Sequence, residues 1–210
     1  MARLARNIYL ASRSPRRREL LAQIGVGFEL LLFRSALEGD QEVDEAPLGA
    51  ELPETYVRRV CRAKAETGWR RLLQRHLAPA PVLSADTTVT LAGRILGKPE
   101  TRRDAVAMLV ELSGQRHEVL TAVAVKLDDQ IEMALSRSEV KLRDLSEAEI
   151  RAYLATGDGD DKAGAYGIQG RFAQFIEEIR GSYSGIVGLP LFETAQLLER
   201  FVLRNDRRRR

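Results

Sequence analysis

Three consecutive arginines follow two serines and a proline in the segment ASRSPRRREL, residues 11–20. Ser14 is a typical N-cap and Pro15 a typical first helical residue, so a helix is expected to begin here, directly after a short strand. Positive charge in a first turn opposes the helix dipole, at a cost of roughly a few tenths of a kcal/mol. Arg16 and Arg17 therefore either share a bound anion with the helix N–H groups or lie solvated at an ordinary helix start.

A lysine interrupts an apolar helix face further along the chain. The helix expected from Pro53 to about His76 has an apolar stripe of Val57, Val60 and Cys61, and Lys64 continues that stripe at helical spacing. An ammonium on such a face must either extend to solvent or meet a polar partner. Extension to solvent is the simpler interpretation of this stretch alone.

Residues 83–99, LSADTTVTLAGRILGKP, read as a β-hairpin with Ala92-Gly93 at its turn. Counting back from the turn pairs Thr87 with Lys98 and places Asp86 beside them. A carboxylate, a hydroxyl and an ammonium would then meet at the open end of the hairpin. The group is either a surface ion pair of little energetic value or a base or metal ligand held rigidly by a strand.

Five glycines occur in residues 157–170, GDGDDKAGAYGIQG. Glycines allow backbone N–H groups to approach a ligand closely, and Lys162 and Gln169 add side-chain donors. The alternative is a flexible connection. The two histidines, His76 and His117, show no metal-ligand spacing, and we interpret both as structural or solvent-facing.

The elements that must position these groups alternate irregularly, with hairpins among them, which favours a mixed α/β sheet over a purely parallel one. The region 36–53 is acidic and rich in turn residues, and reads as a mobile loop. Strands are expected at 8–11, 82–91, 94–97, 119–127, 131–142 and 172–179, and helices at 18–24, 53–76, 101–112, 146–155 and 190–203.

The composition is that of an ordinary globular protein, with 210 residues, 30% charged residues and one cysteine, Cys61. No intramolecular disulfide can form, which favours a reducing, cytoplasmic location. No apolar run is long enough to cross a membrane, and residues 1–10 do not resemble a signal peptide. The net charge of +3 depends on residues 204–210, whose five arginines and one aspartate leave the rest at −1. We expect these residues to form a disordered basic tail; weak contact with RNA or DNA is the alternative.

Seven segments of the chain form an ordered set of motifs: LASRSPRRRELL (10–21), VDE (43–45), ADTTV (85–89), LGKP (96–99), LSGQRHEVLTAVAV (112–125), DKAGAYGIQG (161–170) and GSYSGIVGLPL (181–191). They resemble the motifs of the Maf family of nucleoside triphosphate pyrophosphatases, and more narrowly its branch acting on dTTP and UTP. Two features depart from the family pattern: Thr101 stands where an acidic residue is common, and the loop 33–42 is more divergent.

The resemblance implies one α/β domain over residues 1–203, with a mixed sheet and two lobes around a central cleft, similar to inosine triphosphate pyrophosphatases. It implies hydrolysis of a nucleoside triphosphate at the α-phosphorus by water, assisted by a magnesium or manganese ion. Asp86 and Lys98 are the implied catalytic residues, and Glu45 and Asp86 the implied metal ligands. The implied substrate-binding residues are Ser12, Arg16, Arg17, Lys64, Thr87, Lys162 and Gln169.

Several alternatives remain open at this stage. Asp86 cannot be both a tight metal ligand and a strong free base, and the sequence leaves that choice open. The same chemistry on a modified purine such as 7-methyl-GTP, and a non-catalytic nucleotide-binding regulator, are the competing functions. The expected partner is a small nucleoside triphosphate, with no membrane, no specific nucleic acid, and a homodimer as an option for assembly.

Overall fold

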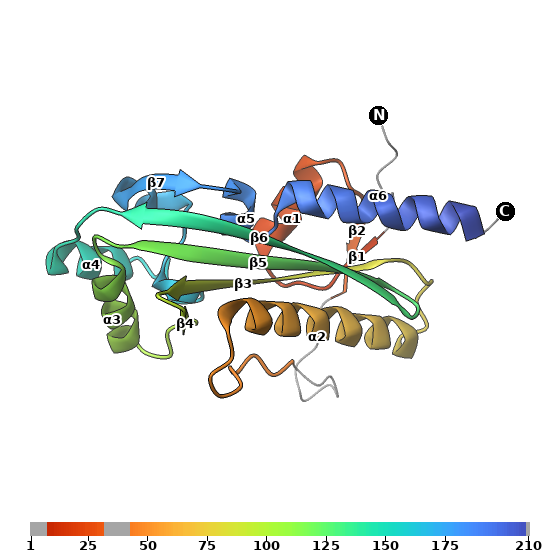
Figure 1. Cartoon of the computed structure of the whole chain (residues 1–210), viewed down its shortest axis with the longest axis horizontal. Helices are drawn as coiled ribbons and strands as arrows, with labels where there is room; N and C mark the ends of the chain where they lie inside the picture. Colours follow the sequence, from red (N-terminus) through yellow and green to blue (C-terminus); the bar gives the residue numbers. More distant parts are fainter. Residues whose placement is uncertain (1–7, 32–42, 209–210) are drawn as a thin grey trace.

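The computed structural model describes residues 8–31 and 43–208, with side chains as far as Phe201. Within these ranges seven strands form one sheet in the order β2-β1-β3-β5-β6-β7, and β4 pairs with β3 outside this path (Figure 1). Strand β1 pairs in parallel with β2 and β3, and the other pairs are antiparallel, which confirms the predicted mixed sheet. The strands are β1 (Ile8–Leu10), β2 (Phe28–Leu30), β3 (Val82–Leu91), β4 (Arg94–Leu96), β5 (Arg116–Leu127), β6 (Gln130–Leu142) and β7 (Ile176–Arg180).

Helices cover both faces of the central strands. Helix α2 (Pro53–Gln74) lies along one face, and α6 (Leu191–Arg208) lies along the other (Figure 1). Side chains alternate between these faces along β5, as expected for a strand. Its residues 119, 123 and 125 join the core cluster that contains Leu197 of α6, whereas residues 120, 122 and 124 join the cluster around Val57 of α2. The middle of the sheet is therefore apolar on both sides, which gives the polar groups of β3 a rigid support.

Local capping explains where several helices begin. Ser14 caps α1 (Pro15–Gln23) by accepting the backbone N–H of Arg17, as its position predicts. Reciprocal capping boxes start α3 (Arg102–Leu112) at Thr101 and α4 (Glu147–Leu154) at Ser146. The remaining α-helix, α5 (Tyr183–Val187), is short and is capped by Ser182. Thr101 thus serves as a helix cap at the position where the resemblance suggests an acid.

Several local predictions differ from the structure. The strand expected at 172–179 is shorter, because residues 170–175 form a 3₁₀ segment, η3 (Gly170–Phe175), before β7. Both Phe172 and Phe175 are buried, and their spacing of three residues suits a 3₁₀ turn better than the alternation of a strand. Helix α6 continues to Arg208, beyond its expected end at 203. Strand β2 and helix α5 were not predicted.

The predicted mobile loop falls partly outside the described residues, at 36–42. The whole divergent segment 33–42 and the tail positions 209–210 also lie outside them.

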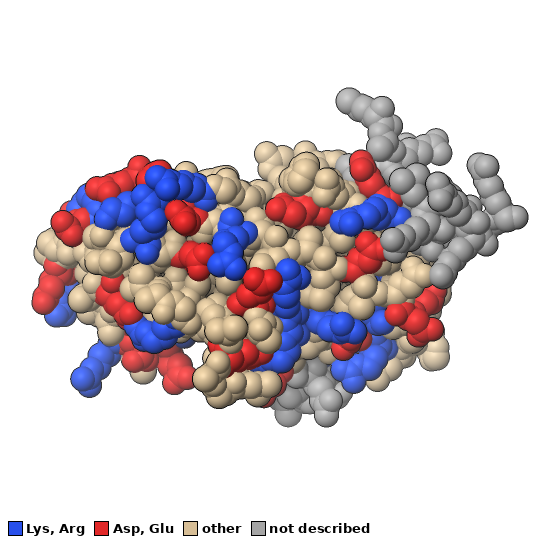
Figure 2. All heavy atoms as spheres, viewed as in Figure 1, with Lys and Arg blue, Asp and Glu red and all other residues tan. Residues whose placement is uncertain are grey.

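Acidic and basic side chains are intermixed on the face seen in Figure 2, where neither sign forms a continuous patch. Ion pairs also link side chains of different strands. Arg116 of β5 pairs with Glu178 of β7 at 2.5 Å, and Arg137 of β6 pairs with Glu118 of β5 at 2.7 Å. Over residues 8–31 and 43–208, no helix is both long enough and apolar enough to cross a membrane.

Candidate active site

A polar cleft of about 1030 Å³ lies beside β3, between the start of α1, helix α2 and the glycine-rich segment. A volume of this size suits a small-molecule ligand. Ten residues that the sequence singled out line the cleft together, although they lie in five separate parts of the chain. They are Ser12, Arg16, Arg17, Glu45, Lys64, Asp86, Thr87, Lys98, Lys162 and Gln169.

The guanidinium of Arg17 connects three parts of the cleft wall. Its Nε donates to the carbonyl oxygen of Gly188 at 2.7 Å, and its Nη2 donates to Thr87 Oγ1 at 3.2 Å. Its Nη1 donates to Ser12 Oγ at 3.4 Å, and that oxygen also accepts the backbone N–H of Ser14 at 3.2 Å. Burial lowers the pKa of Arg17 from its ordinary value, and the nearby Asp86 carboxylate works in the opposite direction. Through these hydrogen bonds Arg17 links α1, β3 and the segment after α5.

The neighbouring arginine differs from Arg17. Arg16 lines the cleft and is half-buried, and its Nη2 lies beside Gly167 of the glycine-rich segment. The two adjacent arginines thus lie in different surroundings. Arg17 is held by the protein itself, whereas Arg16 is placed along the cleft surface.

Lys64 bridges two carboxylates. Its Nζ lies 2.6 Å from Asp86 Oδ1 and 2.7 Å from Glu45 Oε1. The simpler expectation, an ammonium extended to solvent, is wrong, because the lysine meets partners on β3 and on the segment before α2. Lys98 adds a second cation, with its Nζ 3.7 Å from Glu45 Oε2. Burial raises the pKa of Glu45, but Lys64, Lys98 and Arg17 together outweigh burial and leave that pKa below its ordinary value.

The hairpin has the predicted turn but a shorter ladder. Leu91 pairs with Arg94 as predicted, and the last pair of the ladder is Val89 with Leu96. The predicted pairing of Thr87 with Lys98 is wrong, because the ladder between β3 and β4 ends before it reaches them. On the other side of β3, Thr87 pairs with Thr121 of β5. The two threonine Oγ1 atoms lie 3.0 Å apart. Asp86, Thr87 and Lys98 still line one cleft, because the chain beyond β4 runs along its wall.

The glycine-rich segment forms another part of the cleft wall. Its Lys162 forms an ion pair with Asp161 at 2.7 Å and also donates to the backbone carbonyl of Asp158, while Gln169 is exposed. A Cβ at Gly167 would lie 3.0 Å from the stem of Lys162, so the absence of a side chain there leaves room for that lysine. Lys162 and Gln169 therefore lie along one wall, with Gly167 between them in sequence.

Tyr56 of α2 is a cleft residue that the sequence reasoning missed. Its hydroxyl donates to the backbone carbonyl of Glu45 at 2.9 Å, and Arg59 donates to the carbonyl of Ala46 at 2.9 Å. Burial, followed by the Asp86 and Glu45 charges, raises the pKa of Tyr56 to about 12. Helical spacing could have identified it, because Tyr56 lies two helical steps of four residues before Lys64.

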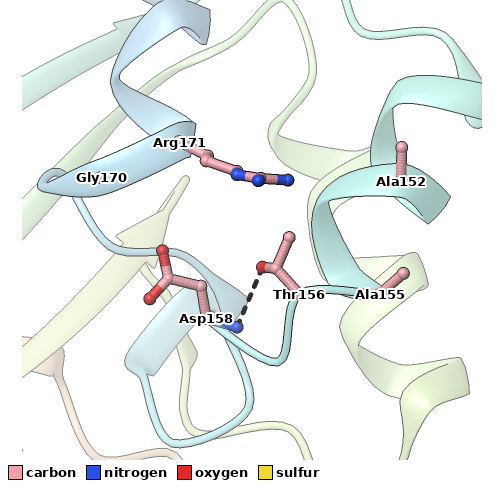
Figure 3. Close-up of a pocket in the computed structure, with 6 residues that line it drawn as sticks. All are labelled: Ala152, Ala155, Thr156, Asp158, Gly170 and Arg171. Atoms are coloured by element: carbon pink, nitrogen blue, oxygen red, sulfur yellow. Dashed lines mark hydrogen bonds between the residues drawn. The ribbon is translucent and has the colours of Figure 1, made fainter.

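A second pocket, of about 560 Å³, lies at the C-terminal end of α4 (Figure 3). Thr156 closes the turn there by accepting the backbone N–H of Asp158 at 3.2 Å. The side chain of Arg171 extends across the pocket from the opposite segment (Figure 3). None of the residues predicted to do chemistry lines this pocket, so the cleft beside β3 is the candidate active site.

The chain was compared with protein families, with curated proteins and with solved structures. The family model described as Maf-like protein matches residues 7–201. A dTTP/UTP pyrophosphatase of Aromatoleum aromaticum is 61% identical over 195 residues, which cover 92% of this chain and 95% of that protein. A dTTP/UTP pyrophosphatase of Nitrosospira multiformis is 59% identical over 197 residues, covering 94% of this chain and 95% of that protein. Among solved structures, the Staphylococcus aureus Ham1 protein matches with a TM-score of 0.45 and 13% identity, covering 95% of this chain and 99% of that one.

Proposed function

Because the chain belongs to the Maf-like protein family, we propose that it is a hydrolase that converts dTTP and UTP to the monophosphate and pyrophosphate. Relatives that are 61% and 59% identical over nearly the whole chain carry the name dTTP/UTP pyrophosphatase. The observation that supports the proposal most strongly is the convergence of the ten predicted residues on one cleft. Cations and paired carboxylates at one place suit a triphosphate better than a neutral ligand.

The cations of the cleft are proposed to hold the phosphate chain. Arg16, Lys98 and Lys162 line its walls, and Ser12 stands at the entrance to α1. The N-terminus of a helix attracts anions, so the start of α1 adds to this field. Arg17 contributes positive charge while its N–H groups keep Ser12 and Thr87 in place. Binding then depends mainly on electrostatic complementarity.

A magnesium or manganese ion is proposed to bind together with the substrate, with Glu45 and Asp86 as its protein ligands. Both carboxylates contact the same ammonium of Lys64, so they lie close enough to share one hard cation. No group of three or more acidic, histidine or cysteine side chains suited to a metal occurs within the described ranges. Magnesium commonly uses one or two carboxylates plus substrate phosphates, which this donor set fits. When bound, such an ion would neutralise charge on the phosphates.

Asp86 is proposed as the acidic group closest to the chemistry. It is 6% exposed and is fixed by Lys64 on the rigid strand β3. In this position it serves either as proton acceptor for the attacking water or as a ligand of the cation. Lys98, proposed as the second catalytic group, is more exposed and lies 3.7 Å from Glu45. We propose that it stabilises charge that develops on the departing pyrophosphate.

Base selection is assigned to Arg16, Thr87 and Gln169. Thymine and uracil present a ring N–H beside carbonyl oxygens, and the amide of Gln169 offers one acceptor and two donors to such an edge. A glutamate at this position could not donate to a carbonyl. We therefore expect both pyrimidine nucleotides to be used in preference to purine nucleotides.

The test is pyrophosphate release from dTTP, UTP, CTP, GTP and 7-methyl-GTP at one magnesium concentration, with inorganic phosphate measured in parallel. The proposal expects the highest kcat/KM for dTTP and UTP, with pyrophosphate as the product. A higher value for 7-methyl-GTP would overturn the substrate assignment. Nucleotide binding without pyrophosphate release would favour the regulator instead.

We further infer that the protein works in the cytoplasm without a specific nucleic-acid partner. The single cysteine is buried, which is typical of proteins from reducing compartments. The interleaved charges on the face shown in Figure 2 also differ from a basic nucleic-acid footprint.

A further inference from the structure

The wall that carries Lys162 and Gln169 has an unusual backbone. Gly164 and Ala165 follow one another in the left-handed region, at φ of +70° and +60°. Glycine adopts this conformation readily, but alanine does not. The bend at Ala165 must therefore be held by contacts that the neighbouring residues make with the rest of the protein.

Three hydrogen bonds anchor this segment to the rest of the protein. The hydroxyl of Tyr166 lies 2.7 Å from Nε2 of His117 on β5. The backbone N–H of Gly167 donates to the hydroxyl of Tyr153 on α4 at 3.2 Å, and the N–H of Gly164 donates to the carbonyl of Gly97 at 3.0 Å. The first two anchors are side chains, so substitution can remove each of them without changing the wall itself.

His117 is buried in an unusual way for a polar residue. It is 2% exposed, and its Nδ1 has no hydrogen-bond partner within the described part of the chain. Its contact with Tyr166 is therefore the one hydrogen bond that its side chain makes there. Its ring also meets the Tyr166 ring edge-on at 5.5 Å, and Tyr166 stacks on Phe172 at 4.5 Å. An apolar residue could fill this space, so the hydrogen bond itself needs an explanation.

The residues held by these hydrogen bonds lie next to the residues proposed to bind the substrate. Tyr166 itself lines the cleft, between Lys162 and Gln169 in sequence. The next residue, Gly167, packs so closely that a Cβ there would lie 3.0 Å from Lys162 and 3.8 Å from Arg16 Nη2. A shift of Tyr166 would therefore displace Gly167, and with it would change the positions of Lys162, Arg16 and the Gln169 amide.

We propose that His117 is a positioning residue for nucleotide selection, which acts by holding Tyr166 so that Lys162, Gln169 and Arg16 keep their places in the cleft. The proposal rests on the proposed function, because the groups it positions are those assigned to substrate binding. It assigns a role to a histidine that the sequence alone suggested was merely structural or solvent-facing. His117 does not line the cleft and is not a catalytic residue.

The test compares His117→Phe, Tyr166→Phe and the double variant with the wild-type protein on the same five nucleotides. Tyr166→Phe removes one oxygen and keeps the ring stacked on Phe172, so it remains informative if His117→Phe fails to fold. Tyr9→Phe is the matched control, because Tyr9 is also buried but lies outside the cleft. A His117→Gln variant, which can still bond to the Tyr166 hydroxyl, tests rescue.

We expect each single variant to lose about tenfold in the kcat/KM ratio of the preferred nucleotide to CTP, mainly through KM. The double variant should lose no more than either single one, and His117→Gln should recover most of the ratio. An unchanged ratio with a lowered Tm, or losses that add in the double variant, would overturn the proposal. Each variant's kcat/KM ratio is compared with that of the wild type. A wild-type preference for a nucleotide other than dTTP or UTP would therefore contradict the proposed function without affecting this comparison.

Discussion

Arg17 and Gly188 are 171 positions apart in sequence, yet Nε of the arginine donates to the carbonyl of the glycine at 2.7 Å. Gly188 adopts φ of +130°, a conformation that residues with a side chain rarely adopt. The bond fixes the start of α1 to the segment that follows α5. The N–H groups of Arg17 thus donate to oxygen atoms of the protein itself, whereas the neighbouring Arg16 lies along the cleft surface.

Replacement of the two arginines should therefore have different effects. Arg17→Lys keeps the charge but cannot span Ser12, Thr87 and Gly188, so we expect a loss of about 2 kcal/mol of unfolding free energy. For a chain of this length that corresponds to a fall in Tm of roughly 4 to 8 °C. Arg16→Lys should raise KM for the triphosphate with little change in Tm. Differential scanning calorimetry measures the effect on stability, and steady-state kinetics measures the effect on KM. Equal Tm values for both variants would contradict the linking role of Arg17.

Asp86→Asn should reduce kcat by a factor of about 10² to 10⁴, because the variant loses the charge needed by a base or a metal ligand. The two side chains have nearly the same size, so circular dichroism should show an unchanged fold. Asp129→Asn, in the turn between β5 and β6, is the matched control for the same chemical change. Activity of Asp86→Asn within threefold of the wild type would show that the assigned role is wrong.

Gln169→Glu should lower kcat/KM for dTTP and UTP by about tenfold or more. The glutamate cannot donate to a base carbonyl, and it adds a negative charge to a phosphate-binding cleft. Gln174→Glu, on the exposed surface of η3, introduces the same charge outside the cleft and serves as the control. If both variants lost activity equally, the effect would be one of overall charge, and Gln169 would have no specific role.

Tyr56→Phe should weaken the placement of Glu45 without removing its carboxylate. The variant loses the hydrogen bond to the Glu45 carbonyl, so we expect the magnesium concentration for half-maximal activity to rise about fivefold, consistent with loss of an indirect support of a metal ligand. Tyr183→Phe removes the hydroxyl of an exposed tyrosine for comparison. Identical magnesium titrations for the two variants would rule out this positioning role.

The stability of the protein should depend on pH through His117. Burial lowers the pKa of this histidine to about 4, from an ordinary value of 6.5. Between these two values the unfolded chain binds a proton that the folded chain does not, so unfolding becomes easier as the pH falls from 6.5 towards 4. The contribution is fully present above pH 6.5 and is of the order of 3 kcal/mol.

Urea unfolding of the wild type and of His117→Gln at several pH values between 4 and 7 measures this contribution. Paired carboxylates also titrate at low pH, but they are common to both proteins and cancel in the comparison. The difference in unfolding free energy should shrink as the pH falls. A difference that stays constant over this range would contradict the depressed pKa.

Local signals in the sequence were sufficient for much of the fold. Turn chemistry at Ala92-Gly93 placed the first pair of the hairpin, and capping residues such as Ser14 and Thr101 placed helix starts. These features depend on neighbours a few residues apart, which a sequence displays directly. The resemblance to a family then brought residues such as Lys162 and Gln169 into one proposed cleft, and the structure places them there.

Features that depend on distant contacts could not be predicted in the same way. Thr87 pairs with Thr121 because β5 lies next to β3, and hairpin counting cannot reveal that neighbour. The linking role of Arg17 depends on its hydrogen bond to the carbonyl of Gly188, and a backbone carbonyl has no signature in the sequence. Phe172 and Phe175 lie in a strand-like run of the sequence, and their place in the aromatic cluster around Tyr166 depends on contacts that the sequence does not display. In each case tertiary packing outweighs the local preference.

The distribution of the cleft residues has a consequence for biosynthesis. The cleft uses residues from Ala11 to Gly188, so a chain still emerging from the ribosome cannot complete it until Gly188 has been translated. Contacts between such distant parts of a chain also form slowly, because a long loop must close before they gain any energy. In a nascent chain that lacks α5 and the segment after it, Arg17 would lack its hydrogen bond to Gly188. Nucleotide hydrolysis should therefore begin only after α5 and the segment that follows it have been translated and packed against α1.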